Sequence, residues 1–344
     1  MADRVYRTEP TSEEPAWITI PLAVGAVLDG YRLDRFLGAR IPRLSRSRIQ
    51  AIIASGSVSK QGGPGPLVRS STRVREGEVV LVRRPAPPEP DVVLEFRVLH
   101  QDEGLMVVDK PAGLPVHPSA RYHRHTLTAL MRQHLGVGHG WEMAHRLDRE
   151  TSGVMVFGRR GKTGGALKRA FQDRLVRKSY LALVHGELSR SMAIDMPLGP
   201  AARSRIRIKM GPLPTTEGGL AASTEVEPLT RGSFLGDPIT LVRCRPHTGR
   251  QHQIRVHLSA VGHPVLGDKL YGIDEERFLE VTEGGRPMAE LEADLGLERH
   301  ALHAEQLELP HPITGAWSVF TAPWPERLAS ILPGPGHETP HAPG

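Results

Sequence analysis

A charged segment, His145–Gly153 (HRLDRETSG), is the part of this sequence best suited to chemistry. Five of its first six residues are ionisable, a composition that does not suit a buried element. Apolar runs at 105–108 and 154–157 flank the region and are predicted to be core strands. A polar loop held by a rigid core is a common place for catalytic groups. We therefore take Asp148 as the candidate catalytic carboxylate.

The composition predicts a globular protein with a basic surface. Of the 344 residues, 39% are hydrophobic and 24% charged, and the formal net charge is +6. A basic balance favours an anionic partner without identifying it. The aromatic content of 5% argues against a protein that binds mainly by base stacking. No apolar stretch is long enough for a membrane span and no signal core follows Met1, so we expect no export and a cytoplasmic location.

The sequence predicts neither a metal nor a cofactor. The single Cys244 excludes an intramolecular disulfide and a thiolate metal cluster. The histidines, 17 in all, lack partner cysteines and a regular ligand spacing, so we expect no metal site. The sequence also has no Walker-type or dinucleotide-binding glycine motif.

Two short helices followed by small strands are predicted near the N-terminus. The first helix begins at Leu33 and is interrupted by Pro42; the second follows Ser45, an N-cap residue, and stops at Gly56. Basic residues lie outside the apolar positions of this module: Arg32, Arg35, Arg43, Arg46, Arg48, Lys60, Arg69, Arg73 and Arg75.

The pattern of residues 31–84 resembles the small RNA-binding domain named after a small-subunit ribosomal protein, here called the S-four-like domain. On that resemblance, Arg46 and Arg48 of the second helix face RNA phosphates. The alternative is that both arginines lie on an ordinary solvated helix face.

We predict five segments along the chain. They are an N-terminal extension (1–30, with a candidate strand at 17–20), the S-four-like domain (31–84), a proline-rich linker (85–90), a large domain (91–330) and a disordered tail (331–344). Strands with irregularly placed helices in the large domain indicate an α+β fold with a mainly antiparallel sheet. The acidic residues 273–299 are predicted to be a surface insertion.

Four segments of the large domain resemble one known family. They are, in order, Asp109–Pro118 (DKPAGLPVHP), His145–Gly153, Lys178–Ala182 (KSYLA) and Thr248–Asp268 (TGRQHQIRVHL through GHPVLGD). Together they resemble the RluA-type pseudouridine synthases over most of residues 91–325. A minor departure is Gln251, where the family often has Thr. The resemblance implies that the protein isomerises uridine to pseudouridine in RNA without a cofactor or metal.

The resemblance also implies roles for three catalytic candidates. Asp148 matches the catalytic aspartate, either a nucleophile at the ribose C1′ or a base that removes the 2′ proton, and both roles stay open. Arg255 matches an arginine that pairs with the aspartate; without a fixed cation, desolvation would neutralise the carboxylate. Tyr180 matches a tyrosine that stacks on the target base and helps in proton transfer. The alternatives are a surface arginine and a core tyrosine.

RNA-contact candidates lie beside the catalytic ones. Arg146 resembles an arginine that enters the RNA stack when the uridine flips out, and a phosphate contact is the alternative. His145 is interpreted as a positioning residue at the RNA-contact surface. Arg250, in the fourth segment, completes the candidates of the large domain.

The S-four-like domain indicates which class of RNA is the substrate. Family members that carry an S-four-like domain resemble enzymes that act on large-subunit ribosomal RNA, which we expect here, with transfer RNA as the alternative. The competing class is a catalytically silent RNA-binding factor in ribosome assembly. Because Asp148, Tyr180 and Arg255 are all present, the sequence favours an enzyme, and we expect a monomer.

Overall fold

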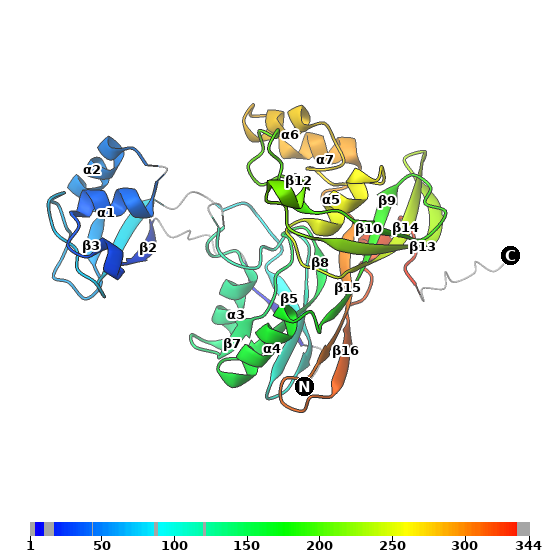
Figure 1. Cartoon of the computed structure of the whole chain (residues 1–344), viewed down its shortest axis with the longest axis horizontal. Coiled ribbons are helices and arrows are strands. Elements are labelled where there is room, and N and C mark those ends of the chain that lie inside the picture. The colour runs from blue at the N-terminus through cyan, green and yellow to red at the C-terminus, as the bar shows by residue number, and fades with distance from the viewer. Residues whose placement is uncertain (1–3, 10–16, 43, 86–88, 120–121, 336–344) are drawn as a thin grey trace. The chain divides into compact units, whose positions relative to one another are not determined.

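The computed structural model describes residues 4–9, 17–42, 44–85, 89–119 and 122–335. The chain divides into two compact units, shown in Figure 1. Residues Met1–Glu9 and Pro90–Gly344 form the large unit, and Pro10–Glu89 form the small unit.

The small unit packs two helices against a three-stranded sheet. Its elements are β2 (Trp17–Ala23), a short 3-10 turn (Ala26–Leu28), α1 (Leu33–Arg40), α2 (Arg46–Ala54), β3 (Val58–Lys60) and β4 (Val79–Pro85), with the antiparallel sheet order β2-β4-β3. Ser45 caps α2 by accepting from the Arg48 N–H, and Gly56 ends it with a φ of +75°. The apolar faces of both helices are buried, as their spacing predicts.

The prediction that residues 1–30 form a separate N-terminal extension is wrong. β1 (Arg4–Arg7) pairs with a strand of the large unit, whereas β2 pairs with β4 of the small unit over seven residues. In β2 the apolar residues alternate with exposed ones, so one face of the strand packs on the small core. Residues 10–16, which precede the first strand of the small unit, lie outside the described residues, and so does Arg43.

The other predicted boundaries also shift. Pro85 ends β4 rather than opening the linker, and residues 86–88 lie outside the described part. The large unit does not end at residue 330: Leu332 is buried, and its carbonyl accepts from the Trp324 indole N–H. The predicted tail from 331 is therefore wrong up to residue 335, and residues 336–344 are not described.

An eleven-stranded sheet forms the centre of the large unit (Figure 1). Its order is β1-β5-β6-β8-β15-β9-β14-β13-β10, with β16 paired to β15 and β7 paired to β8. The strands are β5 (Glu95–Gln101), β6 (Leu105–Lys110), β7 (Trp141–Met143), β8 (Ser152–Arg159), β9 (Arg177–His185), β10 (Met192–Asp195), β13 (Ser223–Phe234), β14 (Asp237–Pro246), β15 (Leu302–Pro310) and β16 (Trp317–Thr321). β8 and β15 pair in parallel and the other described pairs are antiparallel, so the predicted α+β fold is confirmed.

Helices and one hairpin complete the large unit. They are α3 (Leu127–Leu135), α4 (Lys162–Gln172), the hairpin β11 (Leu198–Pro200) and β12 (Met210–Pro212), a 3-10 turn (Thr215–Glu217), α5 (Gln253–Ala260), α6 (Glu275–Thr282), α7 (Met288–Leu295) and α8 (Glu326–Ala329). No described helix has the length and apolar character needed to cross a membrane.

The acidic segment 273–299 is more than a surface insertion. It forms α6 and α7, which contact each other and bury Leu279 and Leu291. The following Leu297 belongs to the core of the large unit. Charged residues outnumber apolar ones in this segment, so its composition gave no indication that Leu279, Leu291 and Leu297 are buried.

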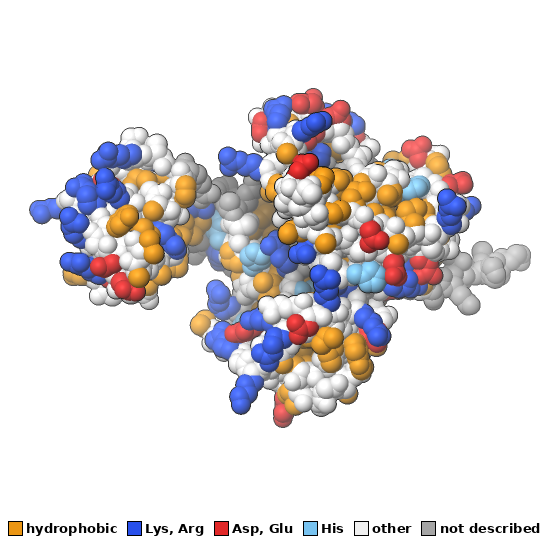
Figure 2. Space-filling model, in the orientation of Figure 1, with side chains coloured by type: hydrophobic (Ala, Val, Ile, Leu, Met, Phe, Trp, Pro, Cys, Tyr) orange, Lys and Arg blue, Asp and Glu red, His pale blue; other side chains and the backbone are white. Residues whose placement is uncertain are grey.

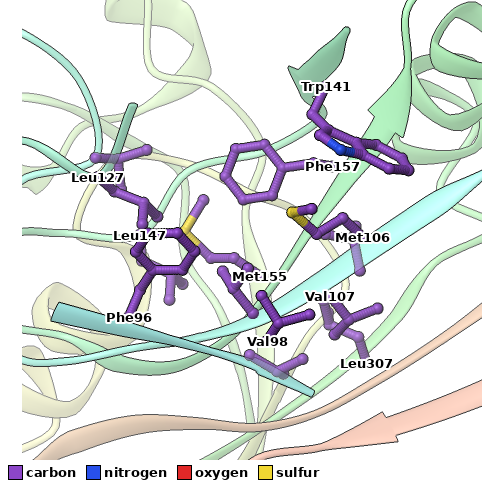
Figure 3. Close-up of a cluster of buried hydrophobic side chains, with 14 of the residues drawn as sticks. Phe96, Val98, Met106, Val107, Leu127, Trp141, Leu147, Met155, Phe157 and Leu307 are labelled. Atoms are coloured by element: carbon purple, nitrogen blue, oxygen red, sulfur yellow. The ribbon is translucent and has the colours of Figure 1, made fainter. Parts of the chain in front are cut away.

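Two apolar clusters meet beneath the charged loop found in the sequence. The first lies between the sheet and α3 and α4, and Figure 3 shows Leu147 within it, beside residues of β5 and β8. The second lies around β9, β14 and α5. Tyr180 packs against both clusters. Leu147 is buried in the core directly before Asp148, and this burial fixes the position of the charged loop at that point.

Candidate active site

A pocket of about 630 Å³ opens in the large unit where the charged loop, β9 and α5 come together. Its lining contains all three catalytic candidates and three RNA-contact candidates: His145, Arg146, Asp148, Tyr180, Arg250 and Arg255. Arg46 and Arg48 lie on α2 of the small unit, where both side chains are exposed. The structure therefore brings six of the eight predicted residues into one site.

Asp148 and Arg255 form the ion pair that the sequence predicts. Arg255 Nη1 donates to Asp148 Oδ2 at 2.9 Å. Asp148 is half-buried, and Arg255 on α5 is 5% exposed. The carboxylate therefore has a fixed, largely desolvated cation beside it and an open side toward the pocket.

A second carboxylate, Asp268, holds the other side of the guanidinium. Arg255 Nε donates to Asp268 Oδ2 at 2.6 Å, and Nη2 donates to Oδ1 at 2.8 Å. Burial by itself would lower the pKa of Arg255, but the charges of Asp268 and Asp148 raise it above its ordinary value. Burial would likewise raise the pKa of Asp268, but Arg255 and two backbone N–H groups lower it. Arg255 and Asp268 are thus charged together.

The residues after Asp148 are held by side chains of two later segments, one between α5 and α6 and one that precedes β15. Glu150 accepts from Lys269 Nζ and the His300 backbone N–H, and Thr151 Oγ1 lies 2.8 Å from His300 Nε2. Arg299 Nη1 donates to Ser152 Oγ at 2.9 Å. These side chains are buried or nearly so, and they fix the loop from one side.

A buried lysine holds the opposite side of the loop. Lys110, at the end of β6, is fully buried and donates to the carbonyls of Pro111, Leu114 and Arg149. The Arg149 carbonyl is one residue from Asp148, so Lys110 ties the charged loop to the turn of the first family-like segment. Burial lowers the pKa of Lys110 to about 7.

Tyr180 is half-buried on β9 and lines the pocket. β9 lies between β14 and β15, so the position of Tyr180 is fixed by strands on both sides. Burial raises the pKa of its phenol, and the charge of Asp148 raises it further. The hydroxyl therefore stays protonated at neutral pH, where it can donate a hydrogen bond.

His252 lies on the other side of Asp148, just before α5. Its backbone has a φ of +56°, and α5 begins directly after it at Gln253. The His252 Nδ1 lies 2.8 Å from Tyr271 Oη, and its Nε2 lies 3.9 Å from Asp148 Oδ2. Burial lowers the pKa of His252 to about 4, so the ring is neutral at physiological pH.

The RNA-contact candidates of the pocket differ in exposure. Arg146 is exposed at the pocket edge. Arg250 donates from Nε to the Ala221 carbonyl at 3.1 Å, which orients its side chain. His145 Nε2 accepts from the Val156 N–H at 3.1 Å, and its ring stacks on Phe171 with centroids 4.7 Å apart. This geometry favours positioning by His145, and its contact with RNA stays a prediction.

Sequence reasoning missed most of the residues that hold the site. Asp268 ends the fourth family-like segment and was given no role, and Lys110, Lys269, Arg299 and His300 were not singled out. Lys110 is the last residue of the apolar strand β6, and Arg299 and His300 lie shortly before β15. Charged residues at the ends of core strands are the signal that could have identified them.

This arrangement can support chemistry at a sugar of an anionic polymer. It offers an ionised carboxylate fixed by a guanidinium, a protonated phenol and several cations around one pocket. Within the described part of the chain, no group of three or more His, Cys, Asp or Glu side chains could hold a metal ion.

Comparisons with known proteins show which family the chain resembles. A family model described as RNA pseudouridylate synthase matches residues 104–260. An uncharacterized RNA pseudouridine synthase from Aquifex aeolicus is 36% identical over 313 residues, covering 87% of this chain and 92% of that protein. Ribosomal large subunit pseudouridine synthase D from Zymomonas mobilis is 34% identical over 319 residues, covering 88% and 93%. The structure of human RNA pseudouridylate synthase domain containing 1 aligns with a TM-score of 0.54 and 28% identity, covering 69% of this chain and 86% of that one.

Proposed function

The chain belongs to the RNA pseudouridylate synthase family, and from this premise we propose that it isomerises specific uridines of large-subunit ribosomal RNA with Asp148 as the catalytic carboxylate. The observation that carries the proposal is the Asp148–Arg255 pair at 2.9 Å, open to a pocket that Tyr180 also lines.

Isomerisation requires that the N1–C1′ bond of the uridine is broken and a C5–C1′ bond is formed. In one route, an Asp148 oxygen attacks C1′ and uracil leaves as the anion; after the base turns, C5 attacks C1′, expels the carboxylate and then loses its proton. In the other route, Asp148 removes the 2′ proton while the N1–C1′ bond breaks, which gives a glycal and the uracil anion. C5 of the uracil then adds to C1′ while Asp148 returns the proton to C2′, and C5 finally loses its own proton as N1 gains one. Both routes start from the ionised carboxylate that Arg255 favours.

The surrounding residues supply binding and orientation. Tyr180 provides an aromatic face for the base and a protonated hydroxyl near Asp148. Arg146 and Arg250 offer cations to the phosphates next to the target, and Arg146 is exposed enough to take the place of a flipped uridine. No cofactor or metal is required for these steps.

Large-subunit ribosomal RNA is the substrate that the relatives' names support. Proteins named ribosomal large subunit pseudouridine synthase D from Zymomonas mobilis and Nitrosomonas europaea are each 34% identical to this chain. The small unit fits an S-four-like RNA-binding domain, because exposed Arg46 and Arg48 lie together on α2. Figure 2 shows Lys and Arg side chains gathered on the visible face of the small unit. Transfer RNA is the alternative substrate.

We further propose that the protein acts in the cytoplasm as a monomer. Ribosomal RNA is available in that compartment, and one chain supplies Asp148, Tyr180 and Arg255 to the same pocket. The competing function, a silent RNA-binding factor in ribosome assembly, would not need this carboxylate and guanidinium to be placed together.

The test is a map of pseudouridines in large-subunit ribosomal RNA from cells with and without this gene. One or a few sites should disappear without the gene, return with the wild-type gene and stay absent with Asp148→Asn. Asp237→Asn, which alters an exposed carboxylate at the start of β14, should restore the sites. If Asp148→Asn restores modification, Asp148 is not the catalytic carboxylate. If no ribosomal site changes, the substrate is another RNA or the protein is a silent factor.

A further inference from the structure

A loop with four cations joins the strands of the β11–β12 hairpin. This basic loop, residues 201–209, contains Arg203, Arg205, Arg207 and Lys209. Its two ends are tied by a hydrogen bond of 3.0 Å from the Ala201 N–H to the Lys209 carbonyl. The loop is therefore closed at its base, and Arg203, Arg205 and Arg207 are exposed on it.

One carboxylate of the acidic helix α6 holds the basic loop at three points. Glu275 accepts from Ser204 Oγ at 2.8 Å, from the Arg205 N–H at 2.7 Å and from Lys209 Nζ at 3.2 Å. The Glu275 side chain is 22% exposed and that of Lys209 is 19% exposed, so the pair is largely shielded from water. Glu275 thus fixes loop backbone as well as loop side chains.

Further contacts join the basic loop to α6. Glu276 accepts from Arg205 Nη1 at 3.0 Å, and Glu283 lies 3.6 Å from Arg205 Nη2. Ile206 is buried in a small cluster with Leu279 of α6 and Leu270. The loop is therefore attached to α6 by an apolar anchor and by two of its four cations.

The other two cations of the loop stay exposed. Within the part of the chain that the structure describes, Arg203 and Arg207 form no ion pair, and both side chains are exposed. Ile208, next to Arg207, is 55% exposed. Figure 2 shows basic and acidic side chains side by side over the α6 region. The contacts with α6 consequently neutralise Arg205 and Lys209 and leave Arg203 and Arg207 available to an anionic partner.

The base of the loop adjoins the wall of the active site. The Met210 N–H, next to Lys209, donates to Tyr271 Oη at 2.9 Å, and the same oxygen lies 2.8 Å from His252 Nδ1. Met210 also packs with Val256, which follows Arg255 on α5. A ligand gripped by the loop therefore lies next to the elements that hold Asp148.

We propose that α6 is a positioning element for RNA: Glu275 holds the basic loop so that Arg203 and Arg207 bind phosphates of the RNA whose uridine enters the pocket. The inference rests on the proposed function, since it needs RNA at the Asp148 pocket. It assigns a role to the acidic segment, which lies beyond the residues 104–260 that the family model matches. The negative charge of Glu275 alone would repel RNA phosphates, whereas the proposal predicts that Glu275 increases RNA affinity.

The test uses the fact that these two effects of Glu275 on RNA affinity have opposite signs. We would compare Glu275→Ala with Glu280→Ala, which removes the same charge from α6 but contacts Arg286 rather than the loop. The probe is an unmodified transcript of large-subunit ribosomal RNA, and its affinity is measured at several salt concentrations. Glu280→Ala should bind slightly more tightly than wild type because a negative charge is lost. Glu275→Ala should bind roughly tenfold more weakly, with a salt slope smaller by about 1 to 2.

A double-mutant comparison separates positioning from misfolding. In a protein that already carries Arg203→Ala and Arg207→Ala, Glu275→Ala should cause no further loss of affinity. Turnover at saturating RNA should stay within about twofold of wild type, since the loop does not hold Asp148 directly. Additive losses, or a Glu275→Ala protein that binds as tightly as Glu280→Ala, would overturn the proposal. If the wild-type protein forms no pseudouridine in this transcript, the proposed substrate fails, whereas the affinity comparison still reports on the loop.

Discussion

Asp268 holds Arg255 by two hydrogen bonds, from Nε at 2.6 Å and from Nη2 at 2.8 Å. Asp268 is in turn fixed by the backbone N–H groups of Leu270 and Tyr271. Because a guanidinium is planar and rigid, this two-point contact sets the direction of the remaining nitrogen, Nη1, which donates to Asp148. Asp268 therefore positions the candidate catalytic carboxylate without lining the pocket.

We predict that Asp268→Asn lowers both turnover and stability. Asparagine keeps one acceptor but places an NH₂ group against an Arg255 donor, and it leaves the buried guanidinium with a single carboxylate. Breaking a buried pair costs about 3–5 kcal/mol of the free energy of unfolding. Loss of the Arg255 orientation should lower kcat on the order of 10²-fold. RNA affinity should change only a few-fold, because phosphate contacts lie elsewhere.

The matched control for Asp268→Asn is Asp294→Asn. Asp294 pairs with Arg277 on the surface, with a side chain that is 37% exposed. A surface pair contributes about 1 kcal/mol or less, so this variant should resemble wild type in denaturant unfolding and in single-turnover assays. Equal effects of the two substitutions would show that Asp268 has no special role.

Tyr180→Phe tests the hydroxyl of the pocket tyrosine. The phenol is protonated because burial and Asp148 raise its pKa, and phenylalanine keeps the ring while removing the donor. If the hydroxyl takes part in proton transfer, kcat should fall about 10²-fold with KM nearly unchanged. Tyr180→Ala should also raise KM, since base stacking worth about 1–3 kcal/mol is lost. Wild-type turnover in Tyr180→Phe would restrict the residue to stacking.

The sequence predicts those parts of the site that depend on local pattern. Asp148 is identifiable because its charged loop interrupts apolar runs, and α2 is identifiable from Ser45 and Gly56 at its ends. A desolvated carboxylate needs a fixed cation, which predicts a basic partner for Asp148, and the resemblance to the family implies that this partner is Arg255. Strands with irregularly placed helices also indicate the α+β class, because that order does not fit alternating strand–helix units.

What the sequence does not predict depends on pairing between distant segments. β1 pairs with β5, for example Arg4 with Val98, and no local pattern contains the register of two segments so far apart in the sequence. His300, just before β15, reaches Thr151 because β15 lies in parallel beside β8. Lys269, between α5 and α6, reaches Glu150 across more than a hundred residues of sequence. Non-local pairing of this kind is set by the whole core rather than by a window of sequence.

Gly153, near the start of β8, pairs with Ala304 of β15 and leaves no room for a side chain. Its φ is +113°, and a Cβ atom there would lie 2.2 Å from the Ala304 carbonyl oxygen. Gly153→Ala should therefore lower the free energy of unfolding by roughly 2–5 kcal/mol, from backbone strain and overlap together. The displaced loop should also lower turnover. Thermal and denaturant unfolding measure the first effect.

Gly165→Ala is the control for this substitution. Gly165 lies within α4, and the nearest atom that a Cβ would meet is the end of a flexible side chain, Arg169 Nη1, at 3.7 Å. Alanine should stabilise the helix there by up to about 1 kcal/mol. Similar unfolding curves for the two variants would contradict the close contact of Gly153 with β15.

Lys178 should make RNA binding depend on pH. The side chain lines the pocket, its Nζ donates to the Thr248 carbonyl at 2.9 Å, and burial lowers its pKa to about 8. The ammonium is charged below that pH and neutral above it. As pH rises from 7 to 9, the pocket loses one cation, and RNA affinity should fall about fivefold, the size of one charge contact of ~1 kcal/mol.

Replacing Lys178 by arginine tests this origin of the pH dependence. Arginine stays charged throughout this range, so Lys178→Arg should bind RNA with nearly constant affinity between pH 7 and 9. Lys168→Arg is the control, because Lys168 also lines the pocket but is 46% exposed and paired with Glu142. The control should keep the wild-type slope. If Lys178→Arg keeps it too, another group causes the loss of affinity and the Lys178 ammonium does not contact RNA.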